Sequence, residues 1–208
     1  MHKISKKLHD HYRATFLKYG ATSKGVDWGN KEWAARLRHE KMLNVIEKPN
    51  VGTVSLLDVG CGYGALADLI KELKIDIDYV GIDVVPEMVL AAEKRHPDFV
   101  FYVSEILDAN MSDYDYVVCN GILTQKLDSS VTEMDLFSEE LIKKMFSISR
   151  CGIAFNLMTS YVNYYSDNLY YRNPSELLRW CMSNLTHRVK LDCSYDLKYE
   201  YTMYLYKE

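Results

Sequence analysis

The pattern of apolar and polar residues changes near the turn-forming segment 49–52. Before it, apolar side chains recur at three- and four-residue spacing from Ile4 to Tyr19, which is the period of a helix with one buried face. A segment interrupted by glycines follows, and a second helical pattern begins after Asn30, a suitable N-terminal cap. The first part of the chain is therefore predicted to form two helices, over residues 3–19 and 31–47.

The second part of the chain alternates short apolar runs with helical patterns. The run 54–59 is apolar along most of its length, as in a parallel strand that helices cover on both faces. The last two runs alternate in polarity and lie close enough along the chain to pair antiparallel. Strands that alternate with helices predict an α/β sheet with right-handed crossovers. The predicted strands are 54–59, 79–83, 99–103, 114–119, 153–158, 189–193 and 199–206, and the predicted helices between them are 65–73, 86–94, about 135–147 and 174–184.

Length and composition indicate a single folded domain. At 208 residues, 48% hydrophobic and 26% charged, the chain can bury a substantial core. Its apolar runs fall short of the roughly 20 residues of a membrane span, and its N-terminus lacks the apolar run of a secretion signal. The five cysteines are odd in number and form no CxxC pair, which disfavours a disulfide framework or a zinc cluster. We expect a cytoplasmic protein with no metal ion and no membrane attachment.

The charge balance argues against a nucleic-acid partner. Lys and Arg number 25 and Asp and Glu number 29, so the formal net charge is −4, whereas proteins that follow a phosphate backbone carry a basic surplus. The charges are unevenly distributed, because residues 1–24 hold six Lys or Arg and a single acid. Two interpretations of this basic segment remain open: a solvated helix face, or an arm that attracts an acidic substrate.

The strongest chemical signal is a glycine loop between a predicted strand and a predicted helix. Gly60, Gly62 and Gly64 follow the strand 54–59, where glycines let the backbone turn tightly and approach a nucleotide. Asp83 ends the next strand, at the place where an acid accepts hydrogen bonds from ribose hydroxyls in nucleotide-binding α/β folds. A helix cap is the alternative role of Asp83. The pattern predicts a nucleotide-containing ligand at the carboxyl ends of the strands.

These residues resemble motifs of the class I S-adenosylmethionine-dependent methyltransferases, in particular bacterial members that act on small molecules. LDVGCGYG at 57–64 is close to the first motif, and VGIDVVPEMVLAAEKR at 80–95 is close to the second. The resemblance implies a Rossmann-like, seven-stranded, mostly parallel α/β sheet in the order 3-2-1-4-5-7-6, with the last strand antiparallel and helices on both faces. It also implies one domain over 1–208, with residues 1–48 as an N-terminal helical cap or lid and 49–208 as the cofactor-binding core.

The resemblance also implies roles for individual residues. Asp58 would orient the glycine loop and the amino group of the methyl donor, Asp83 would hold the ribose, and Val84 would pack on the adenine. Glu105 stands where the family often has an aspartate and is expected to bind the adenine amino group. The residues expected to bind S-adenosylmethionine are Asp58, Gly60, Cys61, Gly62, Asp83, Val84, Glu105, Ile106, Asn120 and Arg38, and those expected to line the acceptor pocket are Trp28, Tyr161, Tyr170 and Tyr171.

The implied reaction is in-line methyl transfer from S-adenosylmethionine to a small-molecule acceptor, with oxygen as the expected acceptor atom. Positioning and exclusion of water supply much of the acceleration in such a reaction. A general base is required only for an acceptor with a high pKa, and none of the six histidines lies in a recognisable base motif. Three alternatives remain open: a nicotinamide-dependent dehydrogenase, a methyltransferase acting on RNA or protein, and a non-catalytic module that binds S-adenosylmethionine.

Overall fold

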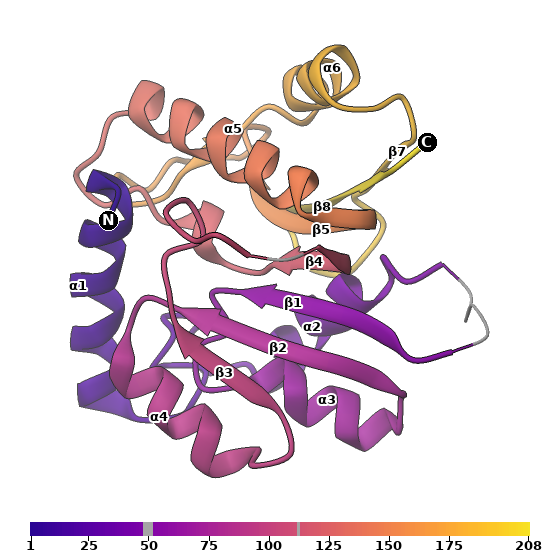
Figure 1. Ribbon diagram of the computed structural model, residues 1–208. Coiled ribbons are helices and arrows are strands. Elements are labelled where there is room, and N and C mark those ends of the chain that lie inside the picture. The colour runs from indigo at the N-terminus through magenta and orange to yellow at the C-terminus, as the bar shows by residue number, and fades with distance from the viewer. Residues whose placement is uncertain (48–51, 112) are drawn as a thin grey trace.

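One mostly parallel sheet forms the centre of the computed structural model, which describes residues 1–47, 52–111 and 113–208 (Figure 1). The strands lie in the order β3-β2-β1-β4-β5-β8-β7, and the short β6 pairs with β5. β8 runs antiparallel to both of its neighbours, and the other pairs are parallel. The strands are β1 (Val54–Val59), β2 (Ile77–Asp83), β3 (Val100–Val103), β4 (Tyr114–Cys119), β5 (Ser149–Thr159), β6 (Tyr171–Arg172), β7 (Val189–Asp192) and β8 (Glu200–Tyr206).

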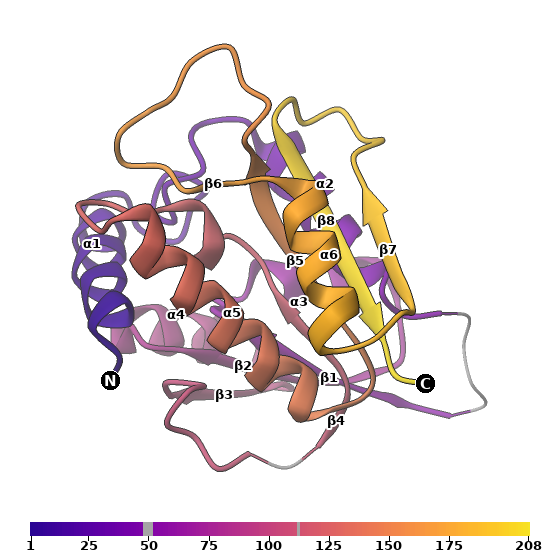
Figure 2. The ribbon, with the colours of Figure 1, turned by 90° about the horizontal axis from the view of Figure 1, so that it is seen from above.

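Helices cover both faces of the sheet (Figure 2). α5 and α6 bury their apolar residues in the core on one face, and α2, α3 and α4 bury theirs on the other face. A 3-10 turn, η1 (Ile122–Thr124), follows β4. The helices are α1 (Lys3–Tyr19), α2 (Glu32–Leu43), α3 (Ala65–Leu73), α4 (Pro86–Arg95), α5 (Val131–Ser147) and α6 (Pro174–Asn184).

The central position of β1 decides where a ligand can bind. β1 pairs with β2 on one side and with β4 on the other. From β1 the chain first adds β2 and β3 on one side, and then crosses back to add β4 and the later strands on the other side. At the carboxyl end of β1, Val59 lies level with Ile82 of β2 and Cys119 of β4. Ligands of open α/β sheets bind at this reversal, outside the carboxyl ends of the strands. The glycine loop and Asp83 both reach this edge.

The two N-terminal helices occupy different places. α1 lies across the carboxyl ends of the strands, at the left of Figure 1, and buries Ile4, Leu8 and Phe16. α2 instead buries Met42 and Leu43 in the same apolar cluster as α3. Within the predicted cap, α1 is therefore the covering element, while α2 belongs to a helix layer of the core. The predicted boundary between residues 48 and 49 and most of the predicted turn 49–52 lie outside the described residues.

The predicted sheet order and the antiparallel last strand are confirmed by this structure. The additional strand β6 is too short for any hydrophobic period to reveal it. α5 begins at Val131 rather than near 135, because Ser130 and Glu133 form a reciprocal capping box that starts the helix earlier. α2 ends at Leu43 rather than at 47, because the chain tightens there into turns in which Val45 N–H donates to Met42 O.

None of the helices in the described part of the chain is long and apolar enough to cross a membrane. Across residues 1–47, 52–111 and 113–208, no group of three or more His, Cys, Asp or Glu side chains is arranged to hold a metal ion.

Candidate functional site

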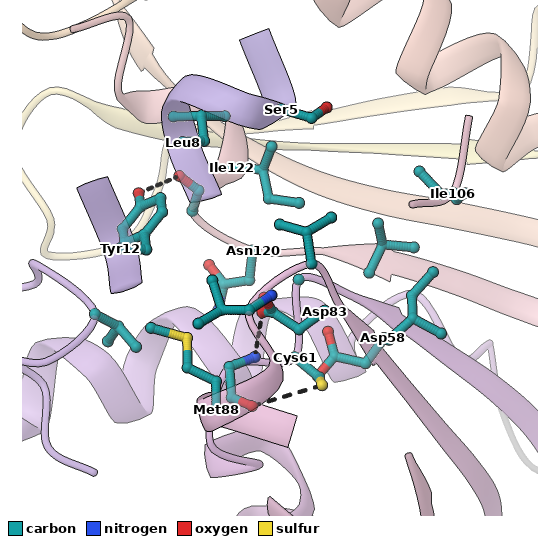
Figure 3. A pocket seen from close by; sticks show the side chains of 18 of the residues that line it. Ser5, Leu8, Tyr12, Asp58, Cys61, Asp83, Met88, Ile106, Asn120 and Ile122 are labelled. Atoms are coloured by element: carbon teal, nitrogen blue, oxygen red, sulfur yellow. Dashed lines mark hydrogen bonds between the residues drawn. The ribbon is translucent and has the colours of Figure 1, made fainter. Parts of the chain in front are cut away.

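A pocket lies at the carboxyl ends of β1, β2 and β4, beneath α1 (Figure 3). The space between its walls is about 1000 Å³ when the open solvent at its mouth is included. Leu8 and Tyr12 of α1 lie on one side of the cavity, and Asp58 and Asp83 lie on the opposite side. The pocket is therefore enclosed between the sheet edge and the N-terminal helix.

The backbone of the loop after β1 is held against the end of β2. The N–H groups of Gly60 and Cys61 both donate to the carbonyl oxygen of Ile82, at 2.8 and 3.0 Å. Gly60 has a φ of 75°, and a Cβ atom there would come within 2.6 Å of the Ile122 side chain. Any other residue would strain the backbone and displace Ile122. Glycine at this position keeps the bare backbone at the wall of the pocket.

Asp83 is buried at the end of β2 and turns its carboxylate onto neighbouring backbone groups. Its Oδ2 accepts the N–H of Gly62 at 2.9 Å, and its Oδ1 accepts the N–H of Val85 at 2.9 Å. Burial raises the pKa of this carboxyl group, while the hydrogen bonds from Val85 and Gly62 act in the opposite direction. Each carboxylate oxygen has a further lone pair. Asp83 thus joins the glycine loop to β2 and keeps acceptor capacity at the pocket.

Asp58, at the bottom of the pocket, is a second buried carboxyl group. The hydroxyl of Tyr79 donates to its Oδ2 at 2.8 Å. The pKa of Asp58 is raised to about 7: burial is the main cause, the negative charge of Asp83 adds to it, and the hydrogen bond from Tyr79 opposes it. Near neutral pH the protonated and ionised forms of Asp58 are therefore both populated, so this side chain can donate as well as accept a hydrogen bond.

Glu105 ties the start of α1 to the loop after β3. The hydroxyl of Ser5 donates to its Oε1 at 2.8 Å, and the N–H of His2 donates to its Oε2 at 3.3 Å. Glu105 also lines the pocket. One carboxylate therefore contacts both the cavity and the helix that covers it.

Trp28 closes the pocket beside the end of β4. Its indole packs on Gly121, where a Cβ atom would come within 2.9 Å of the ring, and Gly121 has a φ of 94°. The N–H of Gly121 donates to Oδ1 of Asn156 at 2.8 Å. The guanidinium of Arg38 lies over the Trp28 ring, with its central carbon 5.1 Å from the centroid of the indole. Glycine after Asn120 is what leaves room for Trp28.

The structure brings most of the predicted site residues together around this cavity. They come from the loops after β1, β2, β3 and β4 and from the segment that precedes α2. The predicted residues that line the pocket are Asp58, Gly60, Cys61, Gly62, Asp83, Val84, Glu105, Ile106, Asn120 and Trp28. Their roles toward a ligand remain predictions.

Arg38 lies in a separate groove on the far side of Trp28. Its Nε donates to Oε2 of Glu200 at 2.9 Å, and its NH2 group pairs with the other carboxylate oxygen of Glu200. The side chains of Arg38 and Glu200 are 16% and 11% exposed. This contact joins α2 to the start of β8, across 162 residues of sequence.

The three predicted tyrosines lie in or after the loop that follows β5. Tyr170 is fully buried in the core, and its hydroxyl donates to Asp135 at 2.6 Å. Tyr161 is 68% exposed. The hydroxyl of Tyr171 accepts the N–H of Ser166 at 3.1 Å, within the same loop. The structure places these tyrosines apart from the residues that line the cavity.

The pocket residues that the sequence does not single out include Ser5, Leu8, Tyr12 and His39. Leu8 and Tyr12 belong to the apolar stripe of α1, which indicates burial but not contact with a ligand. His39 lies in a helix without any motif around it, so no local signal could have identified it. Only the packing of α2 beside the end of β4 brings His39 to the cavity.

Comparison with known proteins identifies a family. A family model described as "Methyltransferase domain" matches residues 57–134, which include the glycine loop, Asp83 and Asn120. The chain is also 37% identical over 160 residues to the putative methyltransferase Rv1506c of Mycobacterium tuberculosis, and the match covers 74% of this chain and 93% of that protein.

Solved structures share the fold at low sequence identity. The magnesium protoporphyrin IX methyltransferase ChlM from Synechocystis PCC 6803, with bound SAM, superposes with a TM-score of 0.68 at 14% identity, over 100% of this chain and 99% of that chain. The DhpI–SAH complex superposes with a TM-score of 0.62 at 17% identity, over 98% and 97% of the two chains.

Proposed function

The chain belongs to the class I S-adenosylmethionine-dependent methyltransferase family, and from this premise we propose that it transfers a methyl group to an oxygen atom of a small-molecule acceptor. The observation that carries the proposal is the buried carboxylate of Asp83, held against the glycine loop by the N–H of Gly62 in an enclosed pocket. S-adenosylmethionine supplies an activated methyl group on a sulfonium, and the protein has to bind, orient and shield the two reactants.

The residues of the pocket suit that cofactor. The unused lone pairs of Asp83 match two ribose hydroxyls, and Val84 and Ile106 offer apolar surface for a flat base. Without a Cβ, Gly60 and Gly62 leave room for a ligand chain to pass close to the backbone. Asp58, with its pKa raised to about 7, can accept from an ammonium group in its ionised form. We assign Glu105 to the adenine amino group, on the same carboxylate that holds Ser5.

A small acceptor is favoured over RNA by the way α1 is held. Three of the cations in residues 1–24 are already paired with acids of the core: Lys3 with Glu133 at 2.7 Å, Lys7 with Asp128 at 2.8 Å, and Arg13 with Glu87. Charges paired in this way attract a phosphate backbone less than free ones do. The basic side chains of α1 therefore help to hold this helix over the pocket. A pocket covered by a helix suits an acceptor small enough to enter beneath it.

We further propose that α1 acts as a lid. It reaches the core through Ser5 and Glu105, through ion pairs, and through the hydroxyl of Tyr12, which donates to Gly121 O at 3.5 Å. Gly20, Gly25 and Gly29 interrupt the segment between α1 and α2. Amide hydrogen exchange over residues 12–30 should slow when cofactor and acceptor are both present. Exchange that is the same with and without ligands would make α1 a fixed part of the core.

Asp83→Ala tests the proposed cofactor site. Charge-assisted hydrogen bonds are worth roughly 1.5–3 kcal/mol each, so the affinity for S-adenosylhomocysteine, the demethylated product, should fall at least about tenfold in calorimetric titration. Asp83→Asn, which keeps one acceptor oxygen, should lose less. Asp196→Ala is the matched control, because Asp196 is an exposed aspartate in the groove beyond Trp28, and it should bind as the wild type does.

Two results would contradict this assignment. Asp83 also satisfies the N–H groups of Gly62 and Val85, so Asp83→Ala should lower the melting temperature as well. A destabilised Asp83→Ala that binds S-adenosylhomocysteine normally would reduce Asp83 to a structural cap. Wild-type protein that binds NAD tightly and neither S-adenosyl compound would overturn the proposed function itself.

A further inference from the structure

Two neighbouring side chains on the wall of the pocket each leave a polar atom without a partner. Nδ2 of Asn120 lies 3.2 Å from Nδ1 of His39, and both residues line the cavity. Nε2 of His39 and Oδ1 of Asn120 are buried, and neither has a hydrogen-bond partner among the described residues. The side chains are only 9% and 7% exposed. Buried polar groups are nearly always hydrogen-bonded, so a ligand is the natural partner of this pair.

The chemistry of the pair restricts that partner. A neutral imidazole has one N–H and one bare nitrogen, and an amide has one donor end and one acceptor end. Whichever end of Asn120 faces Nδ1, the hydrogen bond between the two residues uses one donor and one acceptor. What is left over is therefore a donor on one residue and an acceptor on the other. The two ring nitrogens face opposite sides of the imidazole, so a group bound at Nε2 of His39 does not reach Asn120. A hydroxyl group satisfies Nε2 in either tautomer, because it can donate or accept there.

The surroundings keep His39 neutral. Its pKa is lowered to about 4: burial is the main cause, the positive charge of Arg38 on the same helix adds to the shift, and the carboxylate of Asp68 on α3 opposes it. The indole of Trp28 lies 5.3 Å from the imidazole, ring centroid to centroid, and separates the pair from the groove that holds Arg38. A neutral imidazole at neutral pH has a lone pair available.

We infer that His39 is the general base of the transfer and that Asn120 holds it in the reactive tautomer, with a hydroxyl-bearing acceptor as the substrate class. This inference rests on the proposed function. In the productive arrangement the amide of Asn120 is turned over, so that Nδ1–H of His39 donates to Oδ1 of Asn120, and the acceptor hydroxyl donates to Nε2. Asn120 is then a positioning residue, and His39 is the catalytic residue that the sequence does not reveal.

The proton and electron balance of the step is simple. As the acceptor oxygen forms its bond to the methyl carbon, the bond between carbon and sulfur breaks and its electron pair stays on the sulfur. The hydroxyl proton passes to Nε2, which gives an imidazolium stabilised by the amide oxygen of Asn120. Opening of the pocket returns that proton to water. A general base placed in this way contributes about 10²–10⁴-fold to the rate.

The competing explanation is that the pair binds the amino-acid end of the methyl donor, which also carries one donor group and one acceptor group. Nitrogen NMR of labelled histidine side chains in the wild-type protein separates the two. The signal of His39 is identified by its loss in His39→Gln. S-adenosylhomocysteine alone should leave the Nε2 signal unchanged, and at least one of three hydroxyl probes (phenol, methyl glucoside, glycolate) should then move it, whereas anisole, which lacks the hydroxyl group, should not.

Variants supply a second readout. His39→Gln should bind S-adenosylhomocysteine within about threefold of the wild type by calorimetry, yet transfer methyl groups to the responding probe at least about 100-fold more slowly. His187→Gln is the matched control, because it makes the same substitution at an exposed histidine, and it should match the wild type in both assays. Asn120→Ala should slow transfer and alter the tautomer signature of His39, which a merely structural residue would not do.

The outcomes are distinguishable. An Nε2 signal that responds to S-adenosylhomocysteine, together with more than tenfold weaker binding by His39→Gln, would assign the pair to the donor and overturn this inference. A signal that no hydroxyl probe moves, or unchanged transfer by His39→Gln, would overturn it as well. Wild-type protein that fails to bind S-adenosylhomocysteine would instead refute the proposed function, whatever His39 does.

Discussion

The two sides of the pocket are built in different ways. On the glycine-loop side, formed by residues 58–64 and 83–85, the contacts join two consecutive strand ends: backbone N–H groups bond to Ile82 O and to the carboxylate of Asp83, across 21 residues between Gly62 and Asp83. On the Trp28 side, formed by Trp28, Arg38, His39, Asn120 and Gly121, side chains meet across 81 residues between His39 and Asn120 and across 162 between Arg38 and Glu200.

The difference corresponds to what each side has to recognise. The glycine-loop side presents backbone and two carboxylates that already accept hydrogen bonds from the protein, and it is the side to which we assign the methyl donor. The Trp28 side leaves polar atoms of His39 and Asn120 unpartnered in the described structure, and it is the side to which we assign the acceptor. Unpaired buried groups cost stability, and they are tolerated where a ligand completes them.

The largest expected effect concerns Asp58 on the glycine-loop side. Burial raises its pKa from 3.8 to about 7, so between those values the folded protein binds a proton that the unfolded chain releases. The contribution of Asp58 to stability is therefore greatest below about pH 4 and is lost as the pH rises toward 7. Because each pKa unit is worth about 1.4 kcal/mol, the loss should reach a few kcal/mol.

Denaturant unfolding from about pH 4 to about pH 8 measures this effect. Asp58→Asn is the control, because it can still accept the hydroxyl of Tyr79 but does not titrate in this range. The stability of the wild type minus that of Asp58→Asn should fall across the interval. A difference that is constant with pH would mean that Asp58 is ionised throughout and that this side of the pocket is more polar than its burial implies.

The next effect concerns the ion pair on the Trp28 side. Arg38→Ala leaves Glu200 nearly buried without its cation, which should cost about 3 kcal/mol of stability. Affinity for S-adenosylhomocysteine should stay within about threefold, because Arg38 lies in the groove beyond Trp28. The double variant Arg38→Met/Glu200→Gln, which removes both charges, should recover most of the lost stability. A tenfold loss of affinity in Arg38→Ala would restore the predicted role of Arg38 in binding the cofactor.

A smaller effect concerns the link between the pocket and its cover. Ser5→Ala removes the hydroxyl that donates to Glu105 at 2.8 Å. A hydrogen bond to a charged group is worth about 1.5–3 kcal/mol, and Glu105 is only half-buried, so water replaces part of the bond and the loss should be near the lower value. Hydrogen exchange in α1 should speed up while exchange in β1 stays the same. Equal acceleration in both would mean that α1 opens only when the whole domain unfolds.

The smallest effect is expected at the loop tyrosines. Tyr161→Ala removes a side chain that is 68% exposed, so stability should change by less than about 0.5 kcal/mol. Affinity for S-adenosylhomocysteine should not change, because Tyr161 lies apart from the glycine-loop side. If Tyr161→Ala weakened that binding tenfold, the loop after β5 would have to close onto the pocket in solution.

Local patterns were sufficient for the helices, the strands and most of the glycine-loop side, whereas the order of the strands was implied by the family resemblance. Parallel strands buried on both faces produce continuous apolar runs such as 54–59. Glycines between a strand and a helix allow a tight turn of the backbone, and a short stretch of sequence is enough to recognise them. The predicted strand order is confirmed by the structure. The start of α5 was legible too, since Ser130 and Glu133 carry the spacing of a capping box, although the apolar period alone placed it later.

The sequence by itself determined the sheet, the glycine loop and the acid after β2, because each depends on residues that are near one another in the chain. The tertiary structure alone decided that His39 meets Asn120, that Arg38 is turned away toward Glu200, and that Tyr170 is part of the core. These outcomes depend on how α2, β5 and β8 pack. The residues that meet there are far apart in sequence, and no periodic pattern of apolar residues predicts which of them will meet. The family's ligand is therefore indicated by the sequence, whereas the Trp28 side is decided only when distant helices and strands come together.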